Sequence, residues 1–186
     1  MACHGGFSLD EETRRKWYSP EQILALASLK AGMVFADVGS GDGFFSLLAA
    51  EVVGLAGKVY ALDADPEAIS RLKREAHKRN LTNIHATVGK AESVVFGQNC
   101  VDVVLFSMVL HDFDDPAKVL QNAKLMLKPS AVLVDLDWKK NQMPFGPPMQ
   151  IRFSEEKASE LLKTAGFQVM VIKDAGPHHY VVLAKK

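Results

Sequence analysis

The chain has 186 residues, 48% of them hydrophobic, which is the size and composition of a single globular domain spanning 1–186. Its 22 lysines and arginines balance its 22 aspartates and glutamates, so the sequence lacks the positive excess expected of a nucleic-acid-binding protein. Its two cysteines exclude a disulfide framework. Without a long apolar run or a leader-like opening, no membrane span and a cytoplasmic location are expected. These features favour a small ligand over a nucleic acid.

The first 18 residues show no clean apolar periodicity, and residues 1–18 are therefore predicted to form an N-terminal arm. A helix opening follows directly. Ser19 supplies the N-cap, Pro20 the first helical position, and Gln22 a side chain that reaches back to the cap. This pattern predicts a helix over about 20–30.

The stretch 33–50 predicts a strand, a tight turn and a helix. An apolar run ends at Asp37, a second apolar run begins at Phe44, and between them lie Gly39, Gly41 and Gly43. Glycine can adopt positive φ and lets a ligand approach bare backbone. The first N–H groups of the following helix point outward with the positive end of the helix dipole. The turn therefore predicts a binding site for a carboxylate or phosphate group.

The rest of the chain alternates strands with helices. Strands are predicted at 58–62, 83–88, 101–106, 131–136, 167–172 and 180–184. Helices are predicted to begin at Asp65-Pro66, at Asp115-Pro116 and at Ser154, with Pro129 ending the second. This alternation predicts an α/β fold with a parallel sheet and right-handed crossovers. The connection 173–179 is too short for a crossover, so the final strand is expected to run antiparallel.

The spacing of the glycines identifies the ligand more closely. A dinucleotide fingerprint fails because Phe44 stands where its third glycine belongs, and no phosphate loop with a terminal lysine is present. The segment Asp37–Gly43 resembles motif I, D-x-G-x-G-x-G, of the class I S-adenosylmethionine-dependent methyltransferases, at all four fixed positions. The resemblance covers nearly the whole chain. It implies a three-layer, Rossmann-like, doubly wound sheet in the order 3-2-1-4-5-7-6, with strand 7 antiparallel.

The resemblance also implies the cofactor, S-adenosyl-L-methionine, its product, S-adenosyl-L-homocysteine, and a set of binding residues. Asp63 ends the second strand, where an acid can accept hydrogen bonds from both ribose hydroxyls. Ala64 would lie against the adenine. Ser107, at the exit of the fourth strand, would lie near the methionine portion. With the motif I residues Asp37, Gly39, Gly41 and Gly43, these form the expected cofactor site.

The segment Gly89-Lys90-Ala91-Glu92 stands where the family often has Gly-Asp-Ala, with the acid near the adenine amino group. Lys90 departs from that pattern, because a lysine cannot accept a hydrogen bond from an amine. We therefore expect Glu92 or backbone carbonyls around Ala91 to take this role.

Two residues are candidates for handling a proton during methyl transfer. A neutral amine attacks with its own lone pair, whereas a hydroxyl or an acidic carbon must first lose a proton. His111, after the fourth strand, and Asp137, after the fifth, stand at the expected mouth of the site. His111 is the better base because its ordinary pKa lies near neutrality. The alternative, a loop histidine that holds a backbone group, is equally compatible with the sequence.

The segment after the fourth strand narrows the acceptor. Ser107–Leu110 lacks the Asn or Asp followed by Pro-Pro and an aromatic residue that is typical of enzymes methylating adenine or glutamine nitrogens. The segment 111–116 resembles that of the small ubiquinone/menaquinone-biosynthesis-type (methyltransferase type 11) enzymes. A small-molecule acceptor is therefore expected, and the sequence leaves open whether the chain is a monomer or a homodimer.

Segments outside the core predict the cover of the acceptor site. The arm 1–18 and the proline-rich segment 138–153 are the long connections left once strands and helices are assigned. They carry aromatic residues, namely Phe7, Trp17, Trp138 and Phe145, that either line a pocket or pack on the sheet. A second cluster comprises Cys3, His4, His178 and His179, but its spacing does not match a usual zinc site, and no metal is expected.

Two other classes of protein share part of this pattern. A nicotinamide-dependent oxidoreductase, NAD(P)-linked, would use the same ribose-binding acid, although Phe44 disfavours it. A module that binds S-adenosylmethionine without catalysing a reaction would also keep the whole motif.

Overall fold

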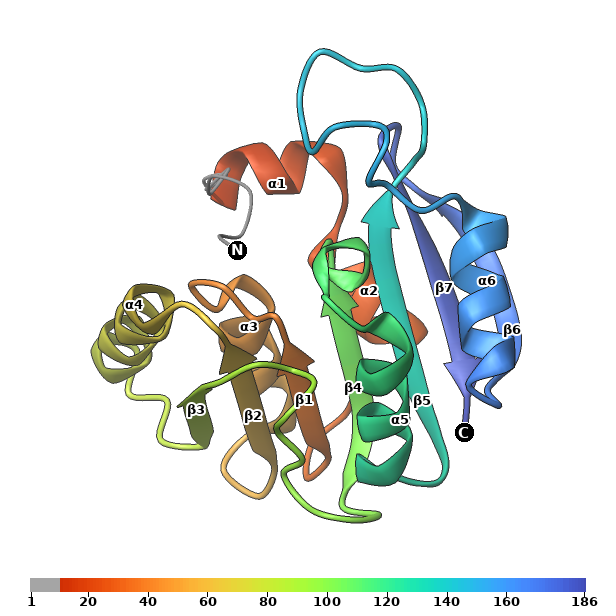
Figure 1. The fold of residues 1–186 in the computed structure, drawn as a ribbon. Helices are drawn as coiled ribbons and strands as arrows, with labels where there is room; N and C mark the ends of the chain where they lie inside the picture. Colours follow the sequence, from red (N-terminus) through yellow and green to blue (C-terminus); the bar gives the residue numbers. More distant parts are fainter. Residues whose placement is uncertain (1–10) are drawn as a thin grey trace.

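The computed structural model describes residues 11–186, and its centre is a seven-stranded sheet in the order β3-β2-β1-β4-β5-β7-β6 (Figure 1). The strands are β1 (Val34–Val38), β2 (Lys58–Asp63), β3 (Ile84–Val88), β4 (Val101–Ser107), β5 (Leu127–Trp138), β6 (Gln168–Ala175) and β7 (His179–Lys185). All pairs are parallel except β5 with β7 and β6 with β7. The predicted fold, strand order and antiparallel strand 7 are confirmed.

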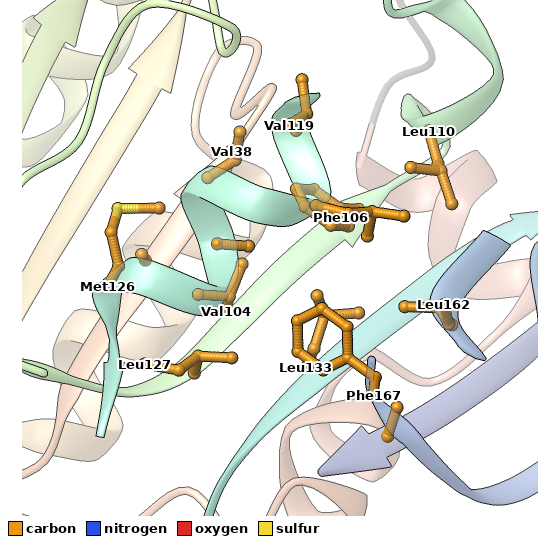
Figure 2. Close-up of a cluster of buried hydrophobic side chains, with 14 of the residues drawn as sticks. Val38, Val104, Phe106, Leu110, Val119, Met126, Leu127, Leu133, Leu162 and Phe167 are labelled. Carbon is orange, nitrogen blue, oxygen red and sulfur yellow. The ribbon is translucent and has the colours of Figure 1, made fainter. Parts of the chain in front are cut away.

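Helices cover both faces of the sheet. They are α1 (Glu11–Trp17), α2 (Pro20–Leu26), α3 (Phe44–Val53), α4 (Pro66–Lys78), α5 (Pro116–Met126) and α6 (Glu155–Thr164), with a short 3₁₀ helix, η1 (Leu110–Asp112). Apolar side chains of α2 and α3 pack on one face of the sheet, and α4 continues that layer beside α3. Side chains of α5 and α6 pack on the other face (Figure 2). Burial of these side chains from water is the main force that holds the three layers together.

Four helices begin at the capping residues that the sequence indicates. Ser19, Asp65, Asp115 and Ser154 each accept a hydrogen bond from a backbone N–H in the first turn of α2, α4, α5 and α6. Such a cap contributes about 1 kcal/mol because it satisfies a donor that has no partner within the helix. Local chemistry therefore fixes where these helices start.

The N-terminal arm differs from the prediction over its second half. Residues 11–17 form α1, whereas residues 1–10 of the predicted arm lie outside the described part of the chain. Glu11 pairs with Arg15 and Glu12 with Lys16, each one turn apart. Because α1 has no buried residue, it carries no apolar periodicity that a sequence search would detect. Helix α2 is also shorter than expected and ends at Leu26.

Strand β5 begins earlier than predicted and contains Pro129, which the sequence marks only as a helix end. Its pairing with β4 shifts register between Leu127 and Val132, so Pro129 and Ser130 lie in an irregular stretch that needs no ladder hydrogen bond there. At its other end β5 extends to Trp138, which was expected to open the lid segment. Strand β6 continues to Ala175, three residues beyond its predicted end, and β7 begins at His179, one residue before its predicted start.

The carboxyl ends of the parallel strands meet at one edge of the sheet, and three connecting features gather there. Figure 1 shows α1, η1 and the segment that follows β5 at this edge. Ligands of doubly wound sheets bind in the crevice outside this edge, where the strand order reverses between β1 and β4. Within residues 11–186, no helix is both long and apolar enough to span a membrane.

Candidate active site

The glycine turn between β1 and α3 has the positive φ angles that its sequence predicts. Gly39, Gly41 and Gly43 lie at φ values of 80°, 54° and 92°. A side chain at Gly39 would collide with Val109, and one at Gly43 would collide with Leu72. A Cβ at Gly41 would meet no atom of the described residues within 4 Å. Gly39 and Gly43 are thus required by packing, whereas Gly41 leaves its side of the turn open to a ligand.

Asp63 lies against this turn. Its Oδ2 accepts a hydrogen bond from the Gly41 N–H at 2.7 Å, and its Oδ1 accepts one from the Asp65 N–H at 2.9 Å. The parallel pairing of β1 with β2 brings the carboxylate to the edge where the turn begins. Each carboxylate oxygen has a second lone pair, so both can still accept from a ligand hydroxyl. Ala64, the next residue, is exposed beside it.

Asp37 and Ser40 provide a test of whether the turn fits S-adenosylmethionine. Asp37 is 1% exposed, and its Oδ2 accepts a hydrogen bond from Ser46 Oγ at 2.6 Å. Its Oδ1 and the Ser40 Oγ are buried without a hydrogen-bond partner among the described residues. Burial, which the hydrogen bond from Ser46 opposes and the charge of Asp63 reinforces, raises the pKa of Asp37 to about 7. Unsatisfied acceptors at this position suit the ammonium group of an amino acid.

The segment 89–92 faces α5. Asn122 Nδ2 donates to the carbonyls of Ala91 and Glu92, each at 2.9 Å, and the Lys90 ammonium lies 3.1 Å from an Asp114 carboxylate oxygen. The Glu92 carboxylate accepts a long hydrogen bond from the Asp115 N–H, at 3.4 Å. These contacts hold the segment against the start of α5. The sequence predicts that this segment lies near the adenine amino group of the cofactor.

The end of β4 brings Ser107 toward the turn. Met108, which follows it, takes a positive φ of 58° and donates its N–H to the Leu136 carbonyl at 2.6 Å. Tyr18, which precedes α2, lies near Ser107, but its hydroxyl makes no hydrogen bond of normal geometry within the described chain. Burial raises the pKa of this phenol, and Arg14 and Ser107 oppose the shift. Sequence analysis missed Tyr18 because it lies in the predicted arm.

His111 and Asp137 form a buried pair between η1 and the end of β5. The His111 Nδ1 lies 2.8 Å from Asp137 Oδ1, and Oδ1 also accepts the Trp138 N–H at 2.7 Å. The side chains of the pair are 1% and 0% exposed. The other ring nitrogen, Nε2, has no hydrogen-bond partner among the described residues and lies 3.5 Å from Asp112 Oδ1. The sequence proposed both residues, and the structure brings them into direct contact.

The charge state of His111 follows from these neighbours. Burial lowers its pKa, but the hydrogen bond and charge of Asp137, together with the charge of Asp112, outweigh burial and raise the pKa above its ordinary value. The buried Arg152 acts in the opposite direction. An imidazole held in this way can exchange a proton at Nε2 while Nδ1 stays fixed.

A second buried acid, Asp135, lies on the same strand face as Asp137. It is fully buried, and neither of its carboxylate oxygens has a partner among residues 11–186. Burial first, and the charge of Asp137 second, raise its pKa well above the usual value. Two acids at alternate positions of an apolar strand were visible in the sequence, but only burial distinguishes Asp135 from a solvent-facing residue.

Arg152 organises the segment 139–152. It is 2% exposed, and its guanidinium donates to the carbonyls of Pro147 (2.7 Å), Phe145 (2.9 Å), Asn141 (3.2 Å) and Lys139 (3.3 Å). It also lies 5.5 Å from the centre of the Trp138 ring. A residue that the sequence did not mark thus holds most of the predicted lid in one conformation.

The aromatic side chains pack on one another rather than surround an open space. Trp17 contacts Trp138 edge-on at 5.5 Å between ring centres and stacks on Phe145 at 5.0 Å. His179 is fully buried beside Trp138, and burial lowers its pKa to about 3. Cys3 and His4, its proposed partners, lie outside the described residues, among which no group of three metal-binding side chains occurs.

Among the surface hollows of the described residues, one lies near the turn and another lies away from it. One, of about 360 Å³, lies between α1, α3 and α4 and is lined in part by Arg14, Asp42 and Phe44. The other, of about 500 Å³, lies beside α6 and β6 and has Glu155 and Ile172 in its wall. Neither is lined by a residue that the sequence predicts to bind the cofactor. The turn and its unpartnered polar atoms therefore define the candidate site.

Comparisons with known proteins bear on the same turn and sheet. A family model described as a methyltransferase domain matches residues 29–175. A solved SAM-dependent methyltransferase from Aquifex aeolicus superposes with a TM-score of 0.90 at 31% identity, over 95% of this chain and 94% of that one. The chain thus belongs to the S-adenosylmethionine-dependent methyltransferase family, in its class I fold.

Curated relatives match over shorter stretches. A probable cobalt-precorrin-6B C(15)-methyltransferase from Sulfolobus acidocaldarius is 40% identical over 93 residues, or 46% of this chain and 48% of that protein. A ubiquinone/menaquinone biosynthesis C-methyltransferase from Hydrogenovibrio crunogenus is 27% identical over 123 residues, or 65% and 48%. The chain spans about half the length of these relatives. They confirm the predicted resemblance and give no support to a nicotinamide oxidoreductase.

Proposed function

We propose that this chain transfers a methyl group from S-adenosyl-L-methionine to a small-molecule acceptor whose attacking atom must lose a proton. The observation that carries the acceptor class is the His111–Asp137 pair, with Nδ1 fixed at 2.8 Å and Nε2 without a hydrogen-bond partner among the described residues. The named relatives include a probable C(15)-methyltransferase and a C-methyltransferase, whose names give carbon as the methylated atom.

The chain's own residues would hold the cofactor at the carboxyl edge of β1 and β2. Asp63 would accept the ribose hydroxyls, and Gly41 would leave room for the ligand against the turn. Asp37 and Ser40 would face its ammonium group, and Ser107 its methionine portion. Ala64 and the 89–92 segment would border the adenine. When bound, the sulfonium supplies an electrophilic methyl group, so the protein contributes mainly alignment and exclusion of water.

His111 would act as the base. Asp137 accepts from Nδ1–H, which leaves the lone pair of neutral His111 at Nε2. Nε2 is buried beside Asp112, so we propose that the η1 turn shifts when an acceptor binds and brings Nε2 into contact with its proton. Asp137 would then stabilise the imidazolium, and the proton would leave to solvent once the acceptor departs.

We propose that the segment 139–153 and α1 form the cover of the acceptor site. The support is the Arg152 network within the segment and the stacking of Trp17 on Phe145, which joins the two. Such a cover excludes water from the methyl donor.

The test combines binding with an acceptor screen. Calorimetric titration should show binding of S-adenosylmethionine and S-adenosylhomocysteine and negligible binding of NAD. An acceptor screen that detects released S-adenosylhomocysteine should respond to phenols or acidic carbon compounds rather than to amines. Turnover with amines alone would contradict the acceptor class, and binding without turnover of any acceptor would support a catalytically silent module.

A further inference from the structure

Two unpartnered hydrogen-bond donors lie beside the glycine turn, and neither belongs to motif I. The Arg14 Nε, from α1, is buried without a hydrogen-bond partner among residues 11–186, and the buried Tyr18 hydroxyl lies near Ser107 but makes no hydrogen bond of normal geometry within this range. Tyr18 is 5% exposed, so its hydroxyl cannot turn to water. Leaving a buried donor without a partner costs about 1–3 kcal/mol, so each such atom needs an explanation.

Aromatic contacts place both donors at the start of α3. The Arg14 guanidinium lies 5.0 Å from the centre of the Phe44 ring, and its Nη2 lies 3.7 Å from an Asp42 carboxylate oxygen. The Tyr18 ring stacks on Phe45 at 6.2 Å and meets Phe44 edge-on at 6.4 Å. Since Asp42 and Phe44 flank Gly43, the two donors adjoin the turn itself.

The chemistry of the two groups selects an anion. A guanidinium donates hydrogen bonds and never accepts them, and it stays charged at any physiological pH. Burial raises the pKa of Tyr18, so the phenol also remains a protonated donor. The charge of Arg14 lowers the pKa of both Tyr18 and Asp37, which shows that it acts on the two groups at once.

Two unpartnered hydrogen-bond acceptors lie at the glycine turn that these donors adjoin. The Asp37 Oδ1 and the Ser40 Oγ are buried and have no partner, as described above. Two donors next to two acceptors suit a group that carries a carboxylate and an ammonium on one carbon, which is the amino-acid end of S-adenosylmethionine. Neither a nucleoside nor a phosphate presents that combination.

We propose that Arg14 and Tyr18 bind the methionyl carboxylate of the cofactor, while Asp37 and Ser40 face its ammonium group. This inference rests on the proposed function and adds α1 to the cofactor site. Cofactor binding would then fix α1, whose Trp17 stacks on Phe145 of the acceptor cover. The carboxylate contact therefore links the two halves of the active site.

A purely structural role for Arg14 makes a different prediction. The ion pair with Asp42 and the contact with Phe44 hold α1 against α3 whether or not a ligand is present. If that were the whole role of Arg14, its loss would lower stability and weaken every adenosine ligand alike. A ligand without a carboxylate distinguishes the two cases.

The experiment is calorimetric titration of S-adenosylhomocysteine and of 5′-methylthioadenosine, which lacks the amino-acid end. Arg14→Gln should weaken S-adenosylhomocysteine binding by about 10- to 100-fold, the loss of one charge-assisted hydrogen bond, and leave 5′-methylthioadenosine unchanged. Tyr18→Phe keeps the ring stacking and should produce a smaller selective loss. Arg15→Gln is the matched control, because Arg15 also lies over the Phe44 ring, at 5.9 Å, but its ion-pair partners among residues 11–186 are the exposed Glu11 and Glu21.

Each remaining outcome decides the question. Equal weakening of both ligands, or no weakening of either in folded variants, would overturn the assignment of Arg14 and Tyr18. Wild-type protein that binds 5′-methylthioadenosine but not S-adenosylhomocysteine would overturn it too. Failure of the wild type to bind either ligand would instead contradict the proposed function, and with it this inference.

Discussion

The Trp17 ring of α1 stacks on the Phe145 ring of the segment after β5, with ring centres 5.0 Å apart and planes 13° from parallel. This contact joins two parts of the chain that are distant in sequence, and both lie at the carboxyl edge of the sheet (Figure 1). A stacked aromatic pair contributes about 0.5–1.5 kcal/mol beyond the area it buries. It therefore gives the proposed cover a measurable link between its halves.

Phe145→Leu should raise the KM for the acceptor more than it weakens S-adenosylhomocysteine binding, because the cover lies on the acceptor side of the proposed site. The free energy of unfolding from urea denaturation should show coupling of about 1 kcal/mol between Trp17→Leu and Phe145→Leu in a double-mutant cycle. Phe96→Leu is the control, because Phe96 stacks on Tyr60 at 4.5 Å and does not contact the cover. Equal effects of the two phenylalanine variants on KM would contradict a role for the segment in acceptor binding.

Asp63→Ala should weaken binding of S-adenosylhomocysteine by roughly 2 to 4 kcal/mol, because it would remove the acceptor of the two charge-assisted hydrogen bonds proposed from the ribose hydroxyls. Part of the loss would come from the turn, since Asp63 also accepts the N–H groups of Gly41 and Asp65. Asp65→Ala is the comparison variant: it removes the α4 cap and the ion pair with Arg71 but keeps both N–H groups that Asp63 accepts, so it should leave binding of S-adenosylhomocysteine nearly unchanged. An unchanged dissociation constant for folded Asp63→Ala would place the ribose elsewhere.

Gly41→Ala should abolish or strongly weaken cofactor binding while costing only about 1–2 kcal/mol of stability, the strain of a left-handed residue. Its Cβ meets no atom of residues 11–186 within 4 Å, so lost binding would report a clash with the ligand. Gly32→Ala is a matched control, because Gly32 also has positive φ and open surroundings. The two variants should show similar midpoints in thermal unfolding. Wild-type affinity in Gly41→Ala would mean that the turn is purely structural.

His111→Asn should lower turnover by about 10²–10⁴-fold, the usual contribution of a general base, and leave cofactor affinity nearly unchanged. The wild-type rate should rise with pH through the raised pKa of His111, because only the neutral imidazole can accept a proton. Asp112→Asn serves as a control and should lower turnover much less than His111→Asn, because Asp112 lies near Nε2 but does not hold Nδ1 in place. If His111→Asn kept both the cofactor affinity and the turnover of the wild type, His111 would have a structural role and would not be the base.

The stability of the His111–Asp137 pair should change with pH in the opposite sense. The folded-state pKa of His111 lies above its ordinary value of about 6.5, so the pair contributes its full stability below that value. The contribution is lost as the pH rises through the folded-state pKa. The difference in free energy of unfolding between wild type and His111→Asn should therefore shrink from pH 6 toward alkaline pH. A difference that grows over this range would contradict the raised pKa.

The sequence by itself determined the alternation of strands and helices, the capped helices and the glycine turn, whereas the sheet order came from the family resemblance carried by residues 37–43. These features depend on neighbours in the chain: Asp65 and Asp115 cap the helices that follow them directly, and Gly41 takes a conformation that only glycine adopts readily. The family's motif could be recognised in the sequence because the residues that shape the turn are the seven consecutive residues 37–43.

Only the tertiary structure decided which side chains are buried together at the carboxyl edge. The contact of His111 with Asp137 depends on the pairing of β4 with β5, and the isolation of Asp135 depends on the packing of the layers above it. Arg14 lies in α1, which has no buried residue and therefore no apolar periodicity, and Tyr18 follows it directly. The position of the Arg14 guanidinium depends on its contact with Phe44 of α3. Local patterns specify backbone conformation, whereas an unsatisfied buried donor exists only once distant segments have excluded water around it.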